Sequence, residues 1–401
     1  MEPITRRKRA VFVRRGRKTV LLALPHADER TVHAILDAAL DWPWRFLDLE
    51  LTRGFIPPGL PVGGAIVNAE AAQPLAGRLR DQAYPVVGLD RRPAAWHGAA
   101  ATVQSDYAAA GRLAADHFAE RGFSRVAYEV SDPRLDVPAL RDAFEARARE
   151  CGMTCSGFRL RSAPPGPGWS ATVARRHEQR ARRITRWLAG LSKPVAVLST
   201  SSATLCDLCT RAGIAVPEEI ALLGVGNHRL PCELSPVPLS SIDMAFEEQG
   251  RQAALLLRRL MRGEAPPKDP VVIEPAGIVA RRSTDTLAIE DESVVRALRF
   301  LWDHYAENLS VEDVAEGVGV PRHHLERAFR RHLRRGVNAE LQRKRIEEFR
   351  RRLRATDLPI ADLAPMTGFR SLTYLHRSFR AATGMTPLQY RQRARRSDPA
   401  S

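Results

Sequence analysis

The sequence predicts a two-lobed α/β domain followed by an all-α domain with two helix-turn-helix units. Three observations lead to this fold class. Strand-like apolar runs alternate with helical stretches over residues 19–290, a short helical pattern occurs twice near the end, and positive charge gathers around that repeat. Alternating strands and helices are typical of parallel α/β sheets.

The charge of the chain is distributed unevenly along its 401 residues. The formal net charge is +16, of which residues 1–18 carry +7 and residues 321–401 carry +13, whereas residues 291–320 carry −5. Residues 19–290 are therefore nearly neutral. A neutral body with a basic end predicts a small-molecule or interaction domain joined to a domain that binds a polyanion.

The basic opening segment resembles the flank of an export signal, with paired arginines. Its apolar stretch, residues 19–25, is too short and runs into "HADER" without a small-residue cleavage site. No run reaches the roughly 18 apolar residues that a membrane span needs. We expect a cytoplasmic protein without a membrane partner, whose basic segment is either an additional DNA arm or a soluble flank.

The strand-like runs of the α/β region are "TVLLALP", "AYPVVGLD", "SRVAYEV", "PVAVLST" and "EIALLGVG". Amphipathic stretches over residues 108–121 and 136–151 lie between them. This alternation predicts parallel sheets in two lobes, with a ligand cleft at the carboxyl ends of the strands. "CDLC" at 206–209 is either half of a metal site or a pair of reduced core thiols. Since no second pair accompanies it, we expect no metal and no cofactor.

The first copy of the repeat is "VEDVAEGVGVPRHHLERAFRR", residues 311–331. Ser310 can cap its first helix, Gly319 supplies a turn, and Pro321 suits the start of the second helix. Along that second helix Leu325 and Phe329 are expected to point inward. A helix, a tight turn and a helix with a cationic outer face form a helix-turn-helix unit, whose second helix enters the major groove.

The second copy lies 49 residues further on before its glycine and 50 residues further on after it. Between the copies, residues 338–357 have helical periodicity and no glycine or proline. About 18 helical residues span roughly 27 Å, close to the roughly 34 Å between successive major-groove faces. Pro365 falls inside the first helix of the second copy, so we expect that helix to end a turn early.

The stretch "IADLAPMTGFRSLTYLHRSFRAATGMTPLQYR" resembles the signature of the AraC family of transcription regulators, with its I-A, G-F, Y, F, G-x-T-P and Y-R elements in order. The resemblance places these residues against base edges: His323, Glu326, Arg327, Leu372, Thr373, His376 and Arg377. Arginine pairs with guanine, glutamate accepts from cytosine, and leucine or threonine contacts a thymine methyl. The candidates for phosphate contacts are Arg322, Arg330, Arg331, Arg370 and Arg380.

The α/β region resembles the sensor of LacI-type regulators and the periplasmic binding proteins, in "DYAAAGRLAADHFAERGFSRVAY", "AGIAVPEEIALLGVGNHRL", "SPVPLSSID" and "IVARRSTD". Such a sensor followed by an AraC-type reader resembles the xylose-responsive activators. The resemblance implies a ligand site with these candidates: Arg141, Trp169, Asn227, Asp106, His26 and Asp28. It also implies carboxylates at positions 199 and 226, where this chain has Ser199 and Gly226.

We therefore expect a basic segment (1–17), a two-lobed ligand-sensing domain of type I periplasmic-binding-protein-like fold (18–286), a linker (287–291), a double helix-turn-helix DNA-binding domain (292–395) and a tail (396–401). The function expected is a transcription activator controlled by a small sugar or polyol. Its expected partners are double-stranded DNA and a second copy of the chain, with RNA polymerase as a further candidate. Two alternatives remain open: a ligand-blind sensor that serves as a dimerisation scaffold, and an α/β enzyme with a DNA-binding tail. The sequence lacks the common catalytic motifs of such an enzyme.

Overall fold

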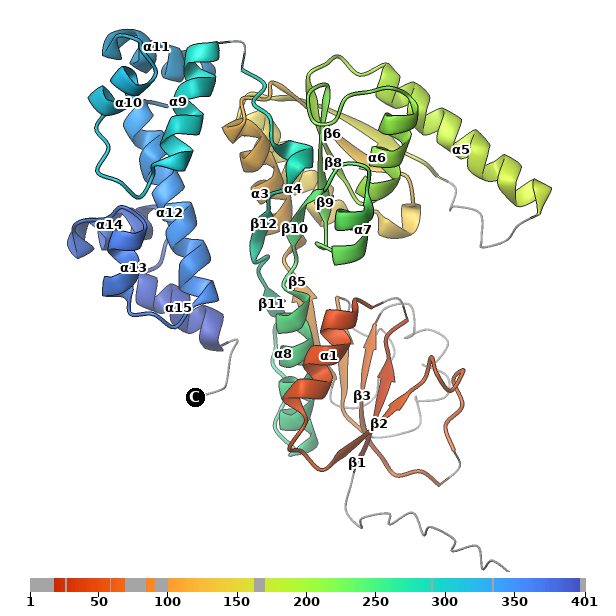
Figure 1. Ribbon diagram of the computed structural model, residues 1–401. Coiled ribbons are helices and arrows are strands. Elements are labelled where there is room, and N and C mark those ends of the chain that lie inside the picture. Colours follow the sequence, from red (N-terminus) through yellow and green to blue (C-terminus); the bar gives the residue numbers. More distant parts are fainter. Residues whose placement is uncertain are drawn as a thin grey trace, which may run out of the picture. The chain divides into compact units, whose positions relative to one another are not determined.

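A computed structural model describes residues 18–25, 27–57, 59–68, 84–90, 100–161, 170–289, 291–333 and 335–396. The chain divides into two compact units (Figure 1). The first comprises residues 1–105 and 246–273, and the second comprises residues 106–245 and 274–401. The chain thus passes from one unit to the other after residues 105, 245 and 273.

The first unit, which we call lobe 1, contains a parallel sheet of the order β11-β5-β4-β3-β1-β2. Its strands are β1 (Lys18–Ala23), β2 (Trp44–Asp48), β3 (Val62–Asn68), β4 (Val86–Leu89), β5 (Ala100–Ser105) and β11 (Val271–Ile273). Helices α1 (Glu29–Ala38) and α8 (Phe246–Met261) pack against each other. The near-continuous apolar strands β1, β3 and β4 are buried, as a parallel sheet covered by helices requires.

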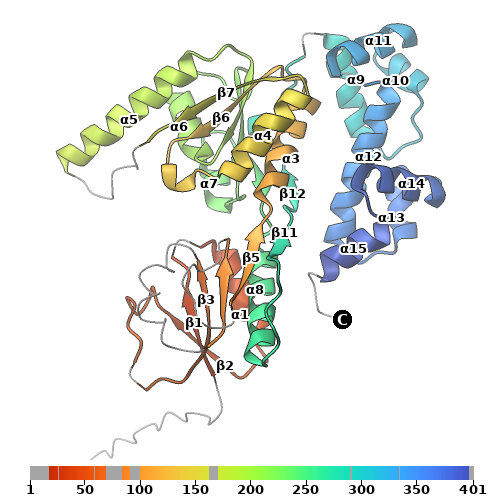
Figure 2. The ribbon, with the colours of Figure 1, turned by 180° about the vertical axis from the view of Figure 1, so that it is seen from behind.

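The sheet-containing part of the second unit, residues 106–245 and 274–286, is called lobe 2. Its sheet has the order β12-β10-β9-β8-β6-β7, and only β12 is antiparallel among the strands described. The strands are β6 (Arg125–Val130), β7 (Thr154–Arg159), β8 (Val195–Ser199), β9 (Ile220–Val225), β10 (Ser240–Asp243) and β12 (Gly277–Val279). The helices are α3 (Tyr107–Glu120), α4 (Pro138–Glu150), α5 (Ala171–Ala189), α6 (Ser202–Arg211) and α7 (Arg229–Leu234), with short 3-10 turns at Pro133–Leu135 and Arg282–Thr284. Figure 2 shows α3 and α4 side by side.

The remainder of the second unit is a helical domain. Its elements are α9 (Glu292–Asp303), α10 (Val311–Gly317), α11 (Arg322–Leu333), α12 (Val337–Ala355), α13 (Ile360–Met366), α14 (Leu372–Thr383) and α15 (Pro387–Arg396). One apolar cluster joins α9, α10 and α11 to the start of α12, and a second joins the rest of α12 to α13, α14 and α15. Helix α12 is therefore the spacer predicted between the two helix-turn-helix units.

One expectation about this domain was wrong. Helix α13 does not end early, because it runs through Pro365 to Met366. Its seven residues match the seven of α10. Proline is tolerated there because it lies in the final turn, where its missing N–H removes a single intrahelical hydrogen bond.

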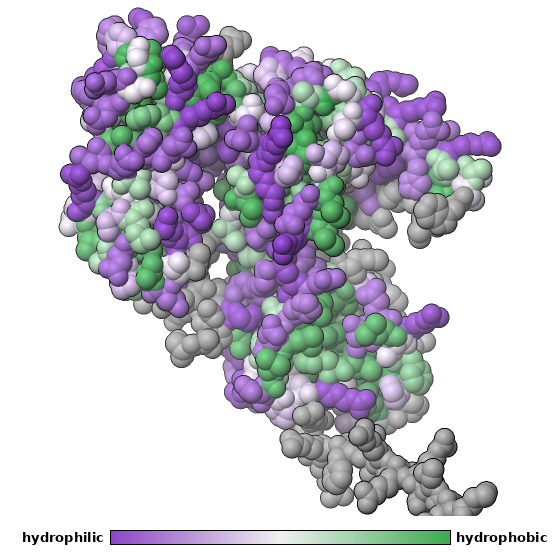
Figure 3. All heavy atoms as spheres, viewed as in Figure 1, coloured by the Kyte–Doolittle hydropathy of each residue, from purple (hydrophilic) through white to green (hydrophobic). Residues whose placement is uncertain are grey.

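No helix among the described residues is both long and apolar enough to cross a membrane. Figure 3 shows hydrophilic side chains gathered over α11 and over α5. Helix α5 carries six arginines and one glutamate, and its first half is exposed except for Val173 and Arg180, which are partly buried. Its buried contacts come from the second half, through Ile184 and Leu188.

Candidate functional site

The first helix-turn-helix unit begins with a reciprocal cap on α10. The Ser310 hydroxyl accepts from the Asp313 amide at 3.1 Å, and the Ser310 amide donates to Asp313 Oδ2 at 2.8 Å. Both hydrogen bonds satisfy amides that the helix start would otherwise leave without an acceptor. Gly319 follows with φ of 69°, a left-handed conformation that favours glycine. Pro321 follows this turn, and helix α11 begins at the next residue.

Helix α11 has one buried face and one exposed face. Leu325 and Phe329 are fully buried, as predicted. His323 and Arg327 are exposed on the other face. Glu326 is only partly exposed and its Oε2 lies 3.7 Å from Nη2 of Arg330. A base contact by Glu326 would therefore compete with this intrahelical ion pair.

The residues of the first helix-turn-helix unit that are predicted to contact DNA phosphates differ in their surroundings. Arg322 forms an ion pair with Glu312 of α10, so its guanidinium is already held by a carboxylate. Arg330 and Arg331 are exposed at the far end of α11. Exposed guanidiniums on one face of a recognition helix can reach phosphate oxygens without a large desolvation cost.

The second helix-turn-helix unit repeats this arrangement. Leu375 and Phe379 of α14 are fully buried. The candidate residues are exposed: Leu372, Thr373, His376, Arg377, Arg370 and Arg380. A shallow hollow of about 420 Å³ is lined by His376, Arg377, Arg380, Ala381 and Thr386. Three predicted DNA contacts therefore share one concave surface.

Sequence reasoning missed two exposed residues on these faces. Tyr374 is 38% exposed, and the Arg377 guanidinium lies 5.5 Å from the centre of its ring. His324 is exposed at the equivalent position of α11. Their offset of 50 residues is the offset of the repeat, which could have identified them. The Tyr374 ring restricts the directions in which Arg377 can extend.

The two helix-turn-helix units are held together by Arg345, which sequence reasoning also missed. Its side chain is buried in α12 and donates to the carbonyl oxygens of Tyr305 at 2.8 Å and Glu307 at 2.6 Å. Gly368, in the turn of the second unit, has φ of 81° and packs so closely that an added Cβ would lie 2.5 Å from the Tyr305 carbonyl oxygen. The first helix-turn-helix unit, the spacer helix α12 and the turn of the second helix-turn-helix unit thus meet at one place.

The carboxyl ends of the lobe 2 strands carry a buried carboxyl that was not predicted. Glu129 of β6 is paired with Ser199 of β8 across the parallel ladder. The Ser199 hydroxyl donates to Glu129 Oε2 at 2.6 Å and accepts from the Ser201 amide at 2.9 Å. Burial raises the pKa of Glu129, although hydrogen bonds from Ser199 and Ser131 oppose this shift. Glu129 therefore lies directly beside Ser199, the position where the resemblance implies a carboxylate.

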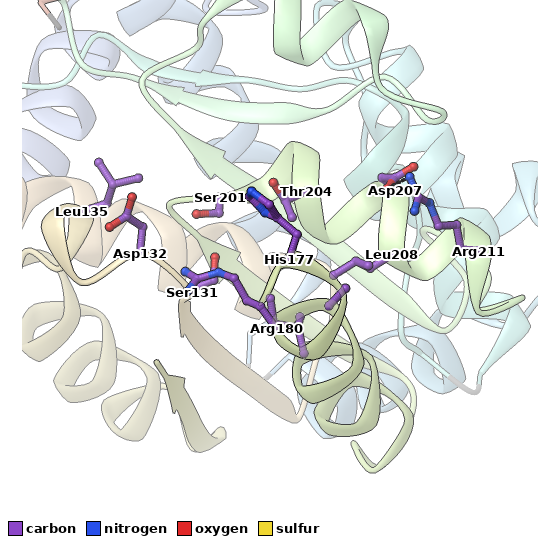
Figure 4. A pocket seen from close by; sticks show the side chains of 12 residues that line it. Ser131, Asp132, Leu135, His177, Arg180, Ser201, Thr204, Asp207, Leu208 and Arg211 are labelled. Carbon is purple, nitrogen blue, oxygen red and sulfur yellow. Dashed lines mark ion pairs between the residues drawn. The ribbon is translucent and has the colours of Figure 1, made fainter. Parts of the chain in front are cut away.

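Lobe 2 also contains a cavity of about 330 Å³ (Figure 4). Its lining comes from the loop after β6, from α5 and from α6, and consists of Ser131, Asp132, Leu135, His177, Arg180, Ala181, Ile184, Ser201, Thr204, Asp207, Leu208 and Arg211. Asp207 and Arg211 form an ion pair of 2.9 Å with each other. The cavity therefore offers hydroxyls, cations and carboxylates around an apolar base.

The ligand residues implied by resemblance have structural partners. Arg141 donates to Asp136 at 2.9 Å and to Asp142 at 3.1 Å. Asp106 caps α3 by accepting from the Ala109 amide at 2.8 Å. These contacts leave the roles of Arg141 and Asp106 in ligand binding as expectations.

The remaining candidates are similar. Asn227 donates to Asp243 at 3.1 Å and accepts from Arg281 at 2.9 Å. Asp28 caps α1 and lies 2.9 Å from the Arg30 guanidinium. Trp169 and His26 lie outside the described residues.

The backbone at position 226 disfavours any residue other than glycine. Gly226 has φ of 101°, and a Cβ added there would lie 2.6 Å from Nε2 of His228. An aspartate at this position would need a strained backbone and a shift of the His228 side chain.

The cysteines of "CDLC" are core thiols. Cys206 and Cys209 are fully buried in the lobe 2 core. Burial raises the pKa of Cys206 and raises that of Cys209 to about 12. No group of metal-ligating side chains occurs among the described residues.

Comparison with known families supports both domains. A model of the periplasmic binding protein-like domain matches residues 115–284, and a helix-turn-helix domain model matches residues 314–393. The xylose operon regulatory protein of Escherichia coli strain K12 is 31% identical over 212 residues, which are 52% of this chain and 54% of that protein. Its counterpart in Haemophilus influenzae is 27% identical over 213 residues, 52% of this chain and 55% of that protein. The chain thus matches these curated relatives over about half their length.

Solved structures show the same fold over most of the chain. The structure of the xylose-binding transcription activator xylR covers 94% of this chain and 98% of its own, with a TM-score of 0.55 and 23% identity. A LacI family regulator from Arthrobacter sp. FB24, in complex with lactose, covers 67% of this chain and 100% of its own, with a TM-score of 0.52 and 20% identity. The predicted order of a two-lobed α/β domain and a helix-turn-helix domain is confirmed.

Proposed function

We propose that this chain, a XylR-like combination of a periplasmic-binding-protein-like domain and an AraC-type helix-turn-helix domain, regulates transcription by reading DNA under the control of a small sugar or polyol. The observation that carries this proposal is the pair of equivalent recognition helices. Helices α11 and α14 each have twelve residues, start 50 residues apart and bury corresponding leucine and phenylalanine side chains.

The exposed faces of these helices have the chemistry that base and phosphate recognition needs. Arg327 and Arg377 occupy equivalent positions and are both exposed. Each guanidinium can donate two hydrogen bonds to the major-groove edge of guanine. The spacer α12 has nineteen residues, a length of about 28 Å at 1.5 Å per residue, which suits two adjacent turns of the major groove.

The effector part of the proposal is supported by the two lobes and by the polar carboxyl edge of the lobe 2 sheet. The relatives named above are regulators of a xylose operon, and neither solved structure is named as an enzyme. This favours a regulator over an α/β enzyme with a DNA-binding tail. The polar cavity favours a sensor that binds ligand over a ligand-blind scaffold.

The proposal has finer features that rest on the family resemblance. We expect a cytoplasmic activator that forms a homodimer and contacts RNA polymerase. Effector would act through different affinities for alternative states of the protein, which is the thermodynamic requirement for any such coupling.

A selection from random double-stranded oligonucleotides tests the proposal with the full chain. We expect enrichment of paired half-sites separated by about one helical turn. Absence of sequence preference at moderate salt would contradict the DNA-reading function. A preference unchanged by both Arg327→Ala and Arg377→Ala would contradict the assignment of the recognition faces.

A further inference from the structure

Helix α5 of lobe 2 presents arginines along one exposed face, which we call the arginine stripe. At about 100° per residue, the stripe occupies an arc of about 120° around the helix. The other residues of this arc are Thr172 and Gln179, which are also exposed. The buried side chains Ile184 and Leu188 lie on the opposite side of the helix. The exposed arginines that form the stripe are Arg175, Arg176, Arg182, Arg183 and Arg186.

The charge of the stripe has little compensation. Arg182 pairs with Glu178 at 2.6 Å, and Glu178 is the only acidic residue of α5. Among the described residues, no ion pair joins any of the other four arginines to a carboxylate. Arg183 and Arg186 lie one turn apart, a spacing at which like charges on a helix repel each other. An anion placed along the stripe would relieve this repulsion.

The stripe does not help to cover lobe 2. Figure 1 shows the first half of α5 extending away from the sheet of that lobe. The helix begins at Ser170, whose hydroxyl accepts from the Val173 amide at 3.3 Å. Only the second half of α5 contributes to the buried core of the lobe, through Ile184 and Leu188. The stripe is therefore open to a large partner.

The composition of the stripe indicates the class of partner. Protein interfaces combine an apolar centre with a polar rim, whereas the stripe contains only arginine, threonine and glutamine. These three side chains are typical donors to the phosphates of DNA. A helix that lies on a membrane surface buries its apolar face in lipid, but the apolar face of α5 packs into the core of lobe 2. The chemistry therefore favours a nucleic acid backbone.

The dimensions of the stripe suit a duplex. From Arg175 to Arg186 the helix rises about 17 Å, at 1.5 Å per residue. B-DNA carries one phosphate charge per about 1.7 Å of its axis, so a duplex segment of this length offers several phosphates. The five guanidiniums and the duplex have complementary charge over the same length.

We propose that the arginine stripe of α5 is a second DNA-binding surface, which contacts the phosphates of duplex DNA without reading bases. This inference goes beyond the proposed function, in which α11 and α14 contact DNA, and rests on it because those helices bring DNA to the protein. Two sources offer the same phosphates: the flank of the duplex that α11 and α14 read, and a separate duplex. The experiment distinguishes these sources.

Fluorescence anisotropy of the full chain with a labelled random-sequence duplex of about 60 base pairs tests the proposal. The α5 variant combines four substitutions at the arginines without ion pairs. We expect its affinity to fall about tenfold or more at about 100 mM salt, and the slope of log affinity against log salt to decrease by about two to four. The substitutions are Arg175→Gln, Arg176→Gln, Arg183→Gln and Arg186→Gln.

A matched control removes the same charge from exposed arginines outside α5, none of which forms an ion pair among the described residues. Its affinity should change less than about threefold, because scattered charges contribute only a general field. Equal losses for the two variants would reject the stripe as a binding surface. Lysine at the four α5 positions should restore most of the binding, and thermal melting should show that every variant is folded. The control substitutions are Arg45→Gln, Arg112→Gln, Arg149→Gln and Arg262→Gln.

Two further measurements identify the source of the phosphates, with the preferred sequence found by oligonucleotide selection as the probe. Affinity that rises as the flanks of this sequence are lengthened, in the wild type but not in the α5 variant, assigns the stripe to the flank. Capture of a second labelled duplex by protein already bound to an immobilised one, again lost in the α5 variant, assigns it to a separate duplex. Loss of neither property in the α5 variant would contradict the proposal.

The same samples separate this inference from the proposed function. The α5 variant should select the same preferred sequence as the wild type, since the stripe reads no bases. A wild-type protein without sequence preference contradicts the regulator. An α5 variant that binds every duplex as the wild type does overturns only the second surface, and leaves an acidic protein as the partner of the stripe.

Discussion

Arg343 of the spacer helix α12 and Glu120 of helix α3 form an ion pair of 2.5 Å between Nη1 and Oε1. The same guanidinium lies 2.9 Å from Glu340, whose side chain is fully buried and also pairs with Arg335 at 2.6 Å. Burial opposes ionisation of Glu340, but Arg343 and Arg335 hold its pKa below its ordinary range. The helix-turn-helix domain is thus joined to lobe 2 through a network of charges.

Arg343→Met should destabilise the protein by about 3 kcal/mol, because it leaves the buried Glu340 and the partly buried Glu120 with less compensating charge. Chemical denaturation of the full chain measures this loss. Arg351→Met is the control, since Arg351 is 65% exposed and pairs only with Glu348 among the described ion pairs. Equal losses for the two variants would show that the network adds no stability.

Arg327→Ala and Arg377→Ala should each weaken operator binding by about 1–3 kcal/mol and relax base preference at one position of the site. The reason is the loss of a bidentate contact to a base edge. Arg331→Ala is the control and should weaken binding to all sequences alike while lowering the salt dependence. Competition binding with single-base operator variants checks both outcomes, and a uniform loss for Arg377→Ala would reassign it to the phosphates.

Glu129→Gln should stabilise the protein more at high pH than at low pH. Burial raises the pKa of Glu129, so the folded state disfavours the ionised form. Stability from this residue is greatest below its ordinary pKa of about 4.3 and falls as the pH rises toward the folded value. Urea denaturation at about pH 5 and about pH 8 measures the difference.

Glu178→Gln, on the exposed part of α5, is the control for the pH experiment and should show no such trend. The positive charge of Arg180 and the hydroxyls of Ser199 and Ser131 act in the opposite direction on Glu129. If these contacts outweigh burial, Glu129→Gln will instead destabilise the protein as the pH rises.

Gly368→Ala should cost about 2–4 kcal/mol, because the position combines a left-handed backbone with close contact to the Tyr305 carbonyl and the Arg345 guanidinium. Gly384→Ala is matched in backbone conformation, with φ of 73°, but has no atom within 4 Å of the added Cβ. It should cost only about 1–2 kcal/mol. Thermal unfolding measures the loss of stability in both variants. Equal losses would mean that the contact between the two helix-turn-helix units shifts without cost to make room for the added methyl group.

The helical elements of the reader could be predicted because their signals are local. Ser310 and Pro321 mark helix starts, and the periodic leucine and phenylalanine positions define one buried face. The repeat itself added confirmation, since each copy places its glycine at a left-handed turn. Pro365 was the exception, because proline in a final turn is tolerated and its effect depends on where the helix ends.

The candidate ligand site was less predictable. The resemblance directs attention to Arg141 and Asp106, yet these side chains pair with neighbours in the fold. Glu129 reads in the sequence as one polar residue within a strand. Its pairing with Ser199 depends on β6 and β8 lying adjacent, and these strands are about 70 residues apart in the chain.

The sequence alone determined that the chain carries alternating strands and helices, then two equivalent helical pairs with cationic outer faces, because those features depend on periodicity and on capping within a few residues. Only the tertiary structure decided which charges are neutralised and which face a cavity. Arg345, Arg343 and Glu129 acquire their partners from distant segments, and burial of a charge is a property of the packed fold that local order does not encode.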